Sequence, residues 1–177
     1  MRVIAGEAKG CPLKASKTAF LRPTSDLIRG AIFSLLESMD VSWERVLDLY
    51  AGTGALGIEA LSRGAAWADF VEKDYHCCET IKVNLERTKL ADRAHVYHLS
   101  LRQALTVLQE RYDMIFMDPP YNEPQIEQTV AAVVDWMGPS SLLAVEHSSR
   151  TPLALSYGSR QLVKNRTHGD TTISIYR

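Results

Sequence analysis

The segment VLDLYAGTGALG, residues 46–57, combines an apolar strand with a glycine-rich turn that opens a helix. Gly52 and Gly54 allow the chain to turn sharply between these two elements, because glycine tolerates positive φ. Other apolar runs predict strands at 69–72, 96–99, 114–117 and 142–146, separated by helical stretches near 56–63, 76–89, 101–110 and 124–136. This β-α alternation predicts a parallel, doubly wound α/β sheet.

The C-terminal part of the chain departs from this alternation. Residues 161–164 and 171–176 are strand-like and are joined by 165–170, which leaves no room for a helix. We expect them to pair as an antiparallel hairpin, which gives a mostly parallel sheet of seven strands. Nothing in the sequence marks a linker, so we expect one domain, with an arm at 1–22 and a Rossmann-like core at 23–177.

The N-terminal segment carries an excess of positive charge. Its strand-like residues 2–5 and 12–15 predict a small hairpin or arm, and a helix capped by Thr24 or Ser25 follows. The first thirty residues contain six Lys or Arg residues and two acids, although the whole chain has a formal net charge of -1. A local basic patch can attract phosphate groups even on an acidic molecule, which favours a nucleic-acid partner.

Composition excludes several classes of protein. The chain has 177 residues, 46% of them hydrophobic, and no apolar stretch that reaches the ~18 residues of a membrane span. It has no apolar leader, so we expect a cytoplasmic protein with no membrane partner. Cys11 stands alone, and the adjacent Cys77 and Cys78 suit neither a disulfide framework nor a metal site. We therefore expect free thiols and no metal.

The glycine turn is compatible with two kinds of cofactor. Gly52, Gly54 and Gly57 have G-x-G-x-x-G spacing, and Glu72 lies at the end of the next strand, where a ribose-binding acid is expected. A dinucleotide therefore fits the spacing. Asp48 favours S-adenosylmethionine instead, because a carboxylate at the turn repels a pyrophosphate but suits the ammonium group of a methionine moiety.

The segment Asp118-Pro119-Pro120-Tyr121 follows the apolar run 114–117 and should lie at the C-terminal end of a strand, where open α/β sheets place their ligands. Asp118 and the carbonyl of Pro119 can accept the two hydrogens of a planar amino group. Tyr121 can stack on the base that carries this group. Together with the glycine turn, the segment predicts an amino methyltransferase.

Motifs spread along nearly the whole chain carry a family resemblance. They are Arg2-Val3-Ile4-Ala5-Gly6 with Lys9-Gly10, Arg22-Pro23-Thr24-x-Asp26, Asp48 to Glu59, Leu61-Ser62-Arg63-Gly64, Val71-Glu72-Lys73-Asp74, the Asp118 segment, Val145-Glu146-His147 and Gly169-Asp170-Thr171. On these motifs the chain resembles the RsmD-like methylases, bacterial 16S ribosomal RNA guanine-N2 methyltransferases. It implies a class I methyltransferase core, S-adenosylmethionine as donor, S-adenosylhomocysteine as product, and a guanine of 16S rRNA in the small subunit as acceptor.

The resemblance also implies roles for individual residues. Asp118 to Tyr121 would be catalytic, with Tyr121 stacking on the base. We expect the cofactor to contact Asp48, Tyr50, Gly52, Gly54, Gly57, Glu72, Lys73 and Ser100. Ser100 stands where the family often has an acid near the adenine. We expect the RNA to contact Lys9, Arg22, Thr24, Arg29 and Tyr121, and the protein to act as a monomer. For Arg22 and Arg29, near a helix start, salt bridges fit equally well.

Three other functions stay open on the sequence. The Asp118 pocket recognises an amino group rather than one base, so a DNA or RNA adenine-N6 or cytosine-N4 methyltransferase is the nearest alternative. An NAD-dependent oxidoreductase fits the glycine spacing but gives the Asp118 segment no role. A non-catalytic RNA-binding module would use only the basic arm.

Overall fold

The computed structural model describes residues 1–15, 25–39, 41, 43–120 and 125–177. Its helices are α1 (Asp26–Glu37), α2 (Ala55–Ser62), α3 (Tyr75–Thr88), α4 (Leu101–Val107) and α5 (Ile126–Val133), with 3-10 turns η1 (Ala91–Arg93) and η2 (Val134–Trp136). Its strands are β1 (Arg45–Leu49), β2 (Trp67–Glu72), β3 (Ala94–His98), β4 (Tyr112–Met117), β5 (Met137–Ser148), β6 (Ser156–Tyr157), β7 (Arg160–His168) and β8 (Thr171–Tyr176).

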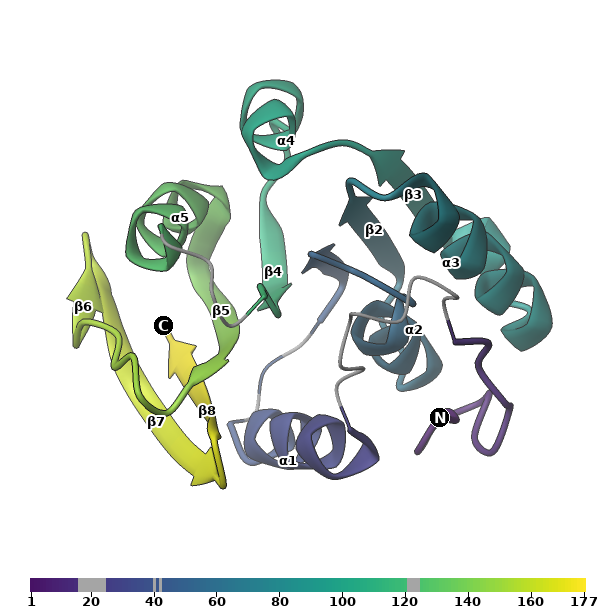
Figure 1. The fold of residues 1–177 in the computed structure, drawn as a ribbon, viewed down its shortest axis with the longest axis horizontal. Helices are drawn as coiled ribbons and strands as arrows, with labels where there is room; N and C mark the ends of the chain where they lie inside the picture. Colours follow the sequence, from purple (N-terminus) through teal and green to yellow (C-terminus); the bar gives the residue numbers. More distant parts are fainter. Residues whose placement is uncertain (16–24, 40, 42, 121–124) are drawn as a thin grey trace.

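The strands of the described residues form one mixed sheet with the order β3-β2-β1-β4-β5-β8-β7-β6 (Figure 1). Strands β1 to β5 pair in parallel, whereas β8 is antiparallel to β5 and β7 is antiparallel to β8. The chain runs outward from β1 through β2 to β3 and then returns to β4 on the other side of β1. The strand order therefore reverses between β1 and β4, and this switch point is where doubly wound sheets bind ligands.

Alternate residues of the central strands enter two separate cores. Val46 of β1 and Phe116 of β4 contact the cluster formed with α1, α2 and α3. Leu47 of β1 and Ile115 of β4 contact the cluster formed with α4 and α5. The sheet is thus covered on both faces, which explains why its central strands are continuous apolar runs rather than alternating ones.

The C-terminal hairpin differs from the prediction. Residues 165–168 were expected in a loop, but they extend β7 and pair with β8 in register down to His168 opposite Thr171. All six residues of β8 are buried, so this strand needs a partner along its full length. Gly169 adopts φ 60°, and a turn of two residues, Gly169 and Asp170, joins β7 to β8. A short strand, β6, adds an eighth member to the seven expected.

The described residues of the N-terminal arm, 1–15, fold back on themselves as a short hairpin. An antiparallel bridge pairs Arg2 with Pro12, and the N–H of Val3 donates to the Cys11 carbonyl at 3.0 Å. Gly6 adopts φ +81°, and a Cβ atom added there would lie 1.7 Å from the carbonyl oxygen of Ser62 at the end of α2. The arm therefore lies directly against α2, and glycine is required at the point of closest approach.

Candidate active site

Three carboxylates lie at the C-terminal ends of neighbouring strands at the switch point. Asp48 is in β1, Glu72 ends β2, and Asp118 directly follows β4. Asp48 and Glu72 are buried, whereas Asp118 is half-buried. The strand register places Leu49 of β1 beside both Val71 and Met117, so the three acids converge at one edge of the sheet.

Asp48 supports the turn that it precedes. Its Oδ2 accepts a 2.8 Å hydrogen bond from the backbone N–H of Gly57 in the first turn of α2. Burial raises the pKa of Asp48 well above its usual value; the Gly57 bond opposes this shift, and the charges of Asp118 and Glu72 add to it. The sequence predicted Asp48 as a cofactor contact, and the structure adds a role in bracing α2.

Glu72 holds the other side of the same turn. One carboxylate oxygen accepts from the N–H of Gly52 and the other accepts from the N–H of Asp74, both at 2.8 Å. The turn between β1 and α2 includes three residues with positive φ, namely Tyr50, Gly52 and Gly54. Each Glu72 oxygen retains accepting capacity after one hydrogen bond, so the carboxylate can still bind a hydroxyl group.

Gly57 lets α2 approach the sheet closely. A Cβ atom at this position would lie 2.4 Å from the ring of Phe70 in β2 and 3.2 Å from the Cβ of Asp48. No side chain fits there without movement of the aromatic ring. The third glycine of the motif therefore lets α2 pack closely on the sheet, with its N-terminus near the carboxylates. Dinucleotide-binding turns use their third glycine for the same close packing of helix against strand.

These carboxylates fit a cationic cofactor better than a pyrophosphate. The described edge brings Asp48, Glu72 and Asp118 close enough to shift the pKa of Asp48. A sulfonium or ammonium group would be attracted to this negative field, whereas a pyrophosphate would be repelled by it. The residues present therefore suit S-adenosylmethionine, and they argue against the dinucleotide that the glycine spacing alone permits.

Ser100 and Lys73 lie at neighbouring positions on the same edge. Ser100 caps α4 in a capping box, and its hydroxyl donates to the Oε1 of Gln103 at 2.7 Å. Lys73 is exposed, and its carbonyl oxygen lies 3.0 Å from the Nε2 of His98. The Ser100 hydroxyl thus already has a structural partner, and it can contact an adenine only through its remaining accepting capacity.

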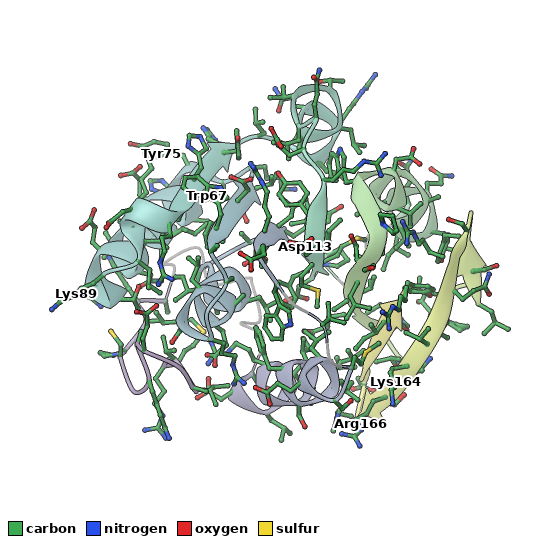
Figure 2. The ribbon with its side chains drawn as sticks, turned by 180° about the vertical axis from the view of Figure 1, so that it is seen from behind. Trp67, Tyr75, Lys89, Asp113, Lys164 and Arg166 are labelled. Carbon is green, nitrogen blue, oxygen red and sulfur yellow. The ribbon has the colours of Figure 1, made fainter. Side chains whose placement is uncertain are left out.

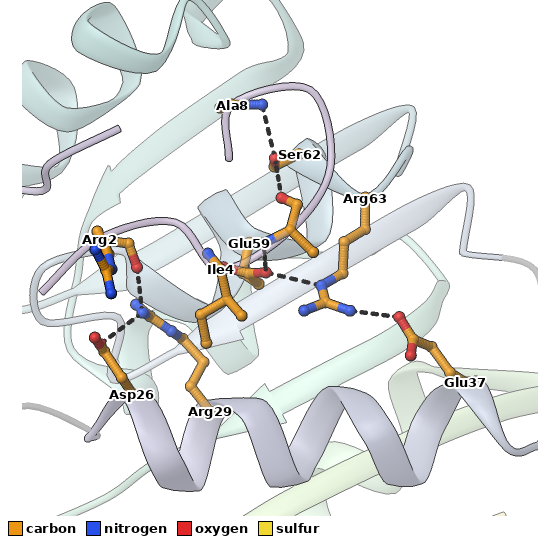
Figure 3. Close-up of polar contacts among 10 residues, drawn as sticks. Arg2, Ile4, Ala8, Asp26, Arg29, Glu37, Glu59, Ser62 and Arg63 are labelled. Carbon is orange, nitrogen blue, oxygen red and sulfur yellow. Dashed lines mark hydrogen bonds and ion pairs between the residues drawn. The ribbon is translucent and has the colours of Figure 1, made fainter. Parts of the chain in front are cut away.

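A buried carboxylate that was not predicted as a site residue holds the N-terminal arm (Figure 3). Glu59 of α2 is 0% exposed and accepts from the N–H of Ile4 at 2.8 Å and the N–H of Ala5 at 2.9 Å. Its Oε1 also accepts from the Nε of Arg63 at 2.8 Å. Glu59 thereby satisfies two backbone donors of a segment that has little secondary structure of its own.

Asn84 connects the arm to the glycine turn. This fully buried side chain of α3 accepts from the N–H of Lys14 at 2.7 Å and donates to the Lys14 carbonyl at 3.1 Å. It also donates to the carbonyl of Thr53 at 2.9 Å. One amide therefore fixes Lys14 of the arm and the turn beside the carboxylates at the same time. Because the partners are 70 and 31 positions away, no local sequence pattern indicates this role.

Arg29 forms the salt bridge that was the alternative to an RNA contact. Both roles were predicted for an arginine near a helix start, and its side chain is 0% exposed. One Nη atom donates to the Arg2 carbonyl and, at 2.9 Å, to Asp26. Burial lowers the pKa of Arg29, and the charges of Glu59 and Asp26 oppose that shift. Arg29 therefore joins α1 to the arm instead of facing solvent.

The other predicted site residues have varied positions. Lys9 is exposed on the arm, Pro119 is buried and Pro120 is exposed. Arg22, Thr24 and Tyr121 lie outside the described residues, and Ser25 caps α1 by accepting from the N–H of Ile28.

His147 has a structural role at the end of β5. Both its ring nitrogens have partners: Nδ1 lies 3.0 Å from the carbonyls of Ser148 and Thr151, and Nε2 lies 2.9 Å from the hydroxyl of Ser174. Two carbonyl partners require Nδ1 to be the donor. Burial lowers the pKa of His147, so the neutral ring is favoured.

All three cysteines lie within the described residues, and none forms a disulfide. The three cysteines are free thiols, as predicted, and Cys77 and Cys78 are buried. Burial, followed by the charge of Glu72, raises the pKa of Cys78 to about 11. The described residues contain no cluster of three potential metal ligands, and none of their helices is long and apolar enough to cross a membrane.

Comparison with known proteins agrees with this architecture. A family model described as Conserved hypothetical protein 95 matches residues 1–177. "Putative rRNA methyltransferase YlbH" of Bacillus subtilis (strain 168) is 34% identical over 182 residues, which cover 100% of this chain and 98% of that protein. "Ribosomal RNA small subunit methyltransferase D" of Escherichia coli (strain K12) is 30% identical over 179 residues, which cover 100% of this chain and 89% of that protein.

A solved structure shares the fold along nearly its whole length. The structure described as "Putative methyltransferase yhhF from Escherichia coli" superposes with a TM-score of 0.87 at 30% identity, and the match covers 99% of this chain and 96% of that chain. The mixed sheet is thus that of a Rossmann-like methyltransferase. The chain belongs to the Conserved hypothetical protein 95 family, a family of methyltransferases that includes relatives named for ribosomal RNA.

Proposed function

We propose that the protein transfers a methyl group from S-adenosylmethionine to the exocyclic N2 amine of a guanine in 16S ribosomal RNA. The observation that carries this proposal is the convergence of Asp48, Glu72 and Asp118 at the switch point, where Pro119 and Pro120 directly follow Asp118. The ribosomal RNA relatives supply the substrate class.

The three carboxylates would divide the work of binding between donor and acceptor. Glu72, at the end of β2, would accept hydrogen bonds from the ribose hydroxyls while it holds the Gly52 N–H. Asp48 lies beneath the turn, and its charge would favour the cationic end of the donor. Asp118, which follows β4, would face the acceptor base.

The chemistry requires a localised lone pair on a weak nucleophile. S-Adenosylmethionine supplies a methyl group on a positively charged sulfur. Asp118 and the carbonyl of Pro119 would accept the two N–H hydrogens of the amine and aim its lone pair at that methyl group. The N–C bond forms as the S–C bond breaks, and the amine then releases one proton to solvent. Positioning and preorganised charge would provide most of the rate enhancement.

Recognition of the RNA would extend beyond this pocket. Tyr121 would stack on the extruded base, and the exposed Lys9 of the arm would contact phosphate. Arg22 and Thr24 remain candidates for the same surface. We propose a cytoplasmic enzyme that acts as a monomer on assembled or assembling small subunits.

Identification of the methylated nucleoside tests this proposal. Small ribosomal subunits that lack guanine-N2 methylation are incubated with labelled S-adenosylmethionine and the protein, and the rRNA is then digested to nucleosides. We expect label in N2-methylguanosine. Label in N6-methyladenosine or N4-methylcytidine would retain the mechanism but contradict the proposed base.

A further inference from the structure

The C-terminal hairpin carries an unexpected concentration of positive charge. Residues 150–177 contain five Lys or Arg residues and one acid, Asp170, in a chain whose formal net charge is -1. Most of β7 is exposed, in contrast to the fully buried β8 beside it. The arm was expected to hold the basic surface, but the hairpin has a comparable excess of charge.

Two of these basic residues share one face of β7. Lys164 and Arg166 are two positions apart, so their side chains project from the same face, about 7 Å apart along the strand. In the antiparallel ladder they lie opposite Ile175 and Ile173, which belong to the core beneath α1. Lys164 is the middle residue of β7 and Arg166 lies nearer its C-terminal end, and Figure 2 labels both. Neither forms an ion pair within the described part of the chain.

The strand register relates this face to the candidate active site. Met117 of β4 pairs with Val145, Val145 pairs with Ser174, and Ser174 pairs with Asn165 of β7. Arg166 therefore lies in the same row as Asp118, three strands away. At about 4.8 Å per strand, the separation across the sheet is about 14 Å.

The two basic segments lie at opposite ends of the sheet. Figure 1 shows the N-terminal arm beside α2 and α3, and the hairpin of β7 and β8 at the other end. Asp118 directly follows β4, which lies between them in the sheet. A polyanion that crosses the C-terminal edge of the sheet can therefore contact both segments while one of its bases enters the site.

We propose that Lys164 and Arg166 of β7 form a docking surface for the phosphate backbone of the RNA substrate. The proposal rests on the proposed function and extends it to a surface outside the base pocket. Its basis is charge complementarity: two unpaired cations on one strand face, in register with the site, oppose a chain of phosphates. Such contacts fix the orientation of the RNA and carry no base specificity.

A second explanation of the same charges is protection of a sheet edge. Only Ser156 and Tyr157 pair with β7 on its outer side among the described residues, and lysines on exposed edges discourage aggregation. The two explanations differ in what they predict. Edge protection affects solubility and leaves RNA affinity unchanged, whereas phosphate docking changes both affinity and its dependence on salt.

The test compares the full-length protein with the double variant Lys164→Gln/Arg166→Gln. Binding to a fluorescently labelled RNA hairpin is measured by anisotropy at several salt concentrations. Losing two phosphate contacts should reduce the slope of log K against log salt by about 1.4 to 1.8. The variant should therefore bind RNA more weakly than wild type at 50 mM salt. The ratio of the two affinities should become about 7- to 12-fold smaller at 200 mM salt.

A charge-matched control separates this effect from net charge. Lys82→Gln/Lys89→Gln removes the same charge from exposed positions on and just after α3, and Figure 2 shows Lys89 far from Lys164. We expect the control to keep the wild-type slope. The single variants Lys164→Gln and Arg166→Gln should each remove about half of the slope change, and they keep the test decisive if the double variant does not fold.

Failure of this inference can be distinguished from failure of the proposed function. If wild-type protein methylates small subunits but the hairpin variants keep wild-type affinity and slope, the docking surface is wrong. Loss of solubility without loss of affinity would assign the charges to edge protection and would also overturn it. If wild-type protein neither binds RNA nor methylates it, the proposed function itself fails. Binding of S-adenosylmethionine should be equal in all variants.

Discussion

Replacing Glu59 with Gln should release the N-terminal arm and destabilise the whole protein. The carboxylate accepts from Ile4 and Ala5 of the arm and from Arg63, and it is 0% exposed. Glutamine has the same shape but only one accepting oxygen. Its NH2 group would face a backbone donor, which leaves at least one buried N–H without an acceptor at a cost of about 1 to 3 kcal/mol.

Loss of the charge sets the larger cost. Glu59 forms an ion pair with Arg63, whose side chain is 12% exposed, and its charge also opposes the effect of burial on the pKa of Arg29. Removing one partner of a buried ion pair costs about 3 to 5 kcal/mol. This loss includes the unmade hydrogen bond, so we take about 3 to 5 kcal/mol as the total. At about 2 to 4 °C for each kcal/mol, the melting temperature should fall by about 6 to 20 °C.

Glu37→Gln is the matched control, because Glu37 pairs with the same Arg63 from the surface. Its side chain is 58% exposed, and surface ion pairs contribute about 0 to 1 kcal/mol. Thermal and urea unfolding of both variants, with limited proteolysis of the arm, provides the assay. Equal stabilities of Glu59→Gln and Glu37→Gln, within about 1 kcal/mol, would refute the argument that the buried carboxylate holds the arm.

Three further predictions concern the turn beside the carboxylates. Gly57→Ala should lower the free energy of unfolding in urea by about 1 to 3 kcal/mol, because its Cβ would lie 2.4 Å from the ring of Phe70. Gly30→Ala in α1 is the control: its Cβ would have no atom within 4 Å, so it should raise the free energy of unfolding by up to about 1 kcal/mol. Asn84→Ala, which removes three hydrogen bonds, should cost about 2 to 3 kcal/mol and speed amide exchange in the arm; unchanged exchange would contradict the link. The pKa of Asp48 is raised in the folded protein, so the folded state binds this proton more tightly than the unfolded state. The contribution of Asp48 to stability therefore falls as pH rises from the pKa of the unfolded chain to that of the folded protein. Asp48→Asn should abolish this loss of stability with rising pH, so the variant should melt at a higher temperature than wild type at neutral pH. It should also bind S-adenosylmethionine more weakly. A melting temperature below that of wild type at neutral pH would contradict this account.

The sequence predicts features that depend on local spacing. Alternation of strands and helices identified the central parallel sheet, because each apolar run of a fully buried strand is visible without tertiary information. The spacing of Gly52 and Glu72 predicted a glycine turn close to the end of the next strand. In the structure the Gly52 N–H donates to the Glu72 carboxylate at 2.8 Å. Asp118 similarly follows β4.

The features that sequence reasoning missed depend on distant partners. The residues near Glu59 in the sequence do not indicate that its carboxylate accepts hydrogen bonds from backbone N–H groups 54 and 55 positions earlier in the chain. The length of β7 was underestimated because its polar residues 165–168 were read as a loop, whereas pairing with the buried β8 makes them a strand. Arg29 was expected to contact RNA because two arginines near a helix start suit a phosphate, whereas the structure shows the alternative, a salt bridge with Asp26.

The most direct test of the central claim is methyl transfer by wild-type protein and by Asp118→Ala, measured together with S-adenosylmethionine binding. The claim is that Asp118 acts on the amine of the acceptor and not on the methyl donor. We predict that the variant binds the donor nearly as well as wild type but transfers methyl to small ribosomal subunits about 100- to 1000-fold more slowly, the usual effect of removing one preorganised hydrogen-bonding group. Transfer at the wild-type rate, or loss of donor binding equal to the loss of transfer, would contradict the account.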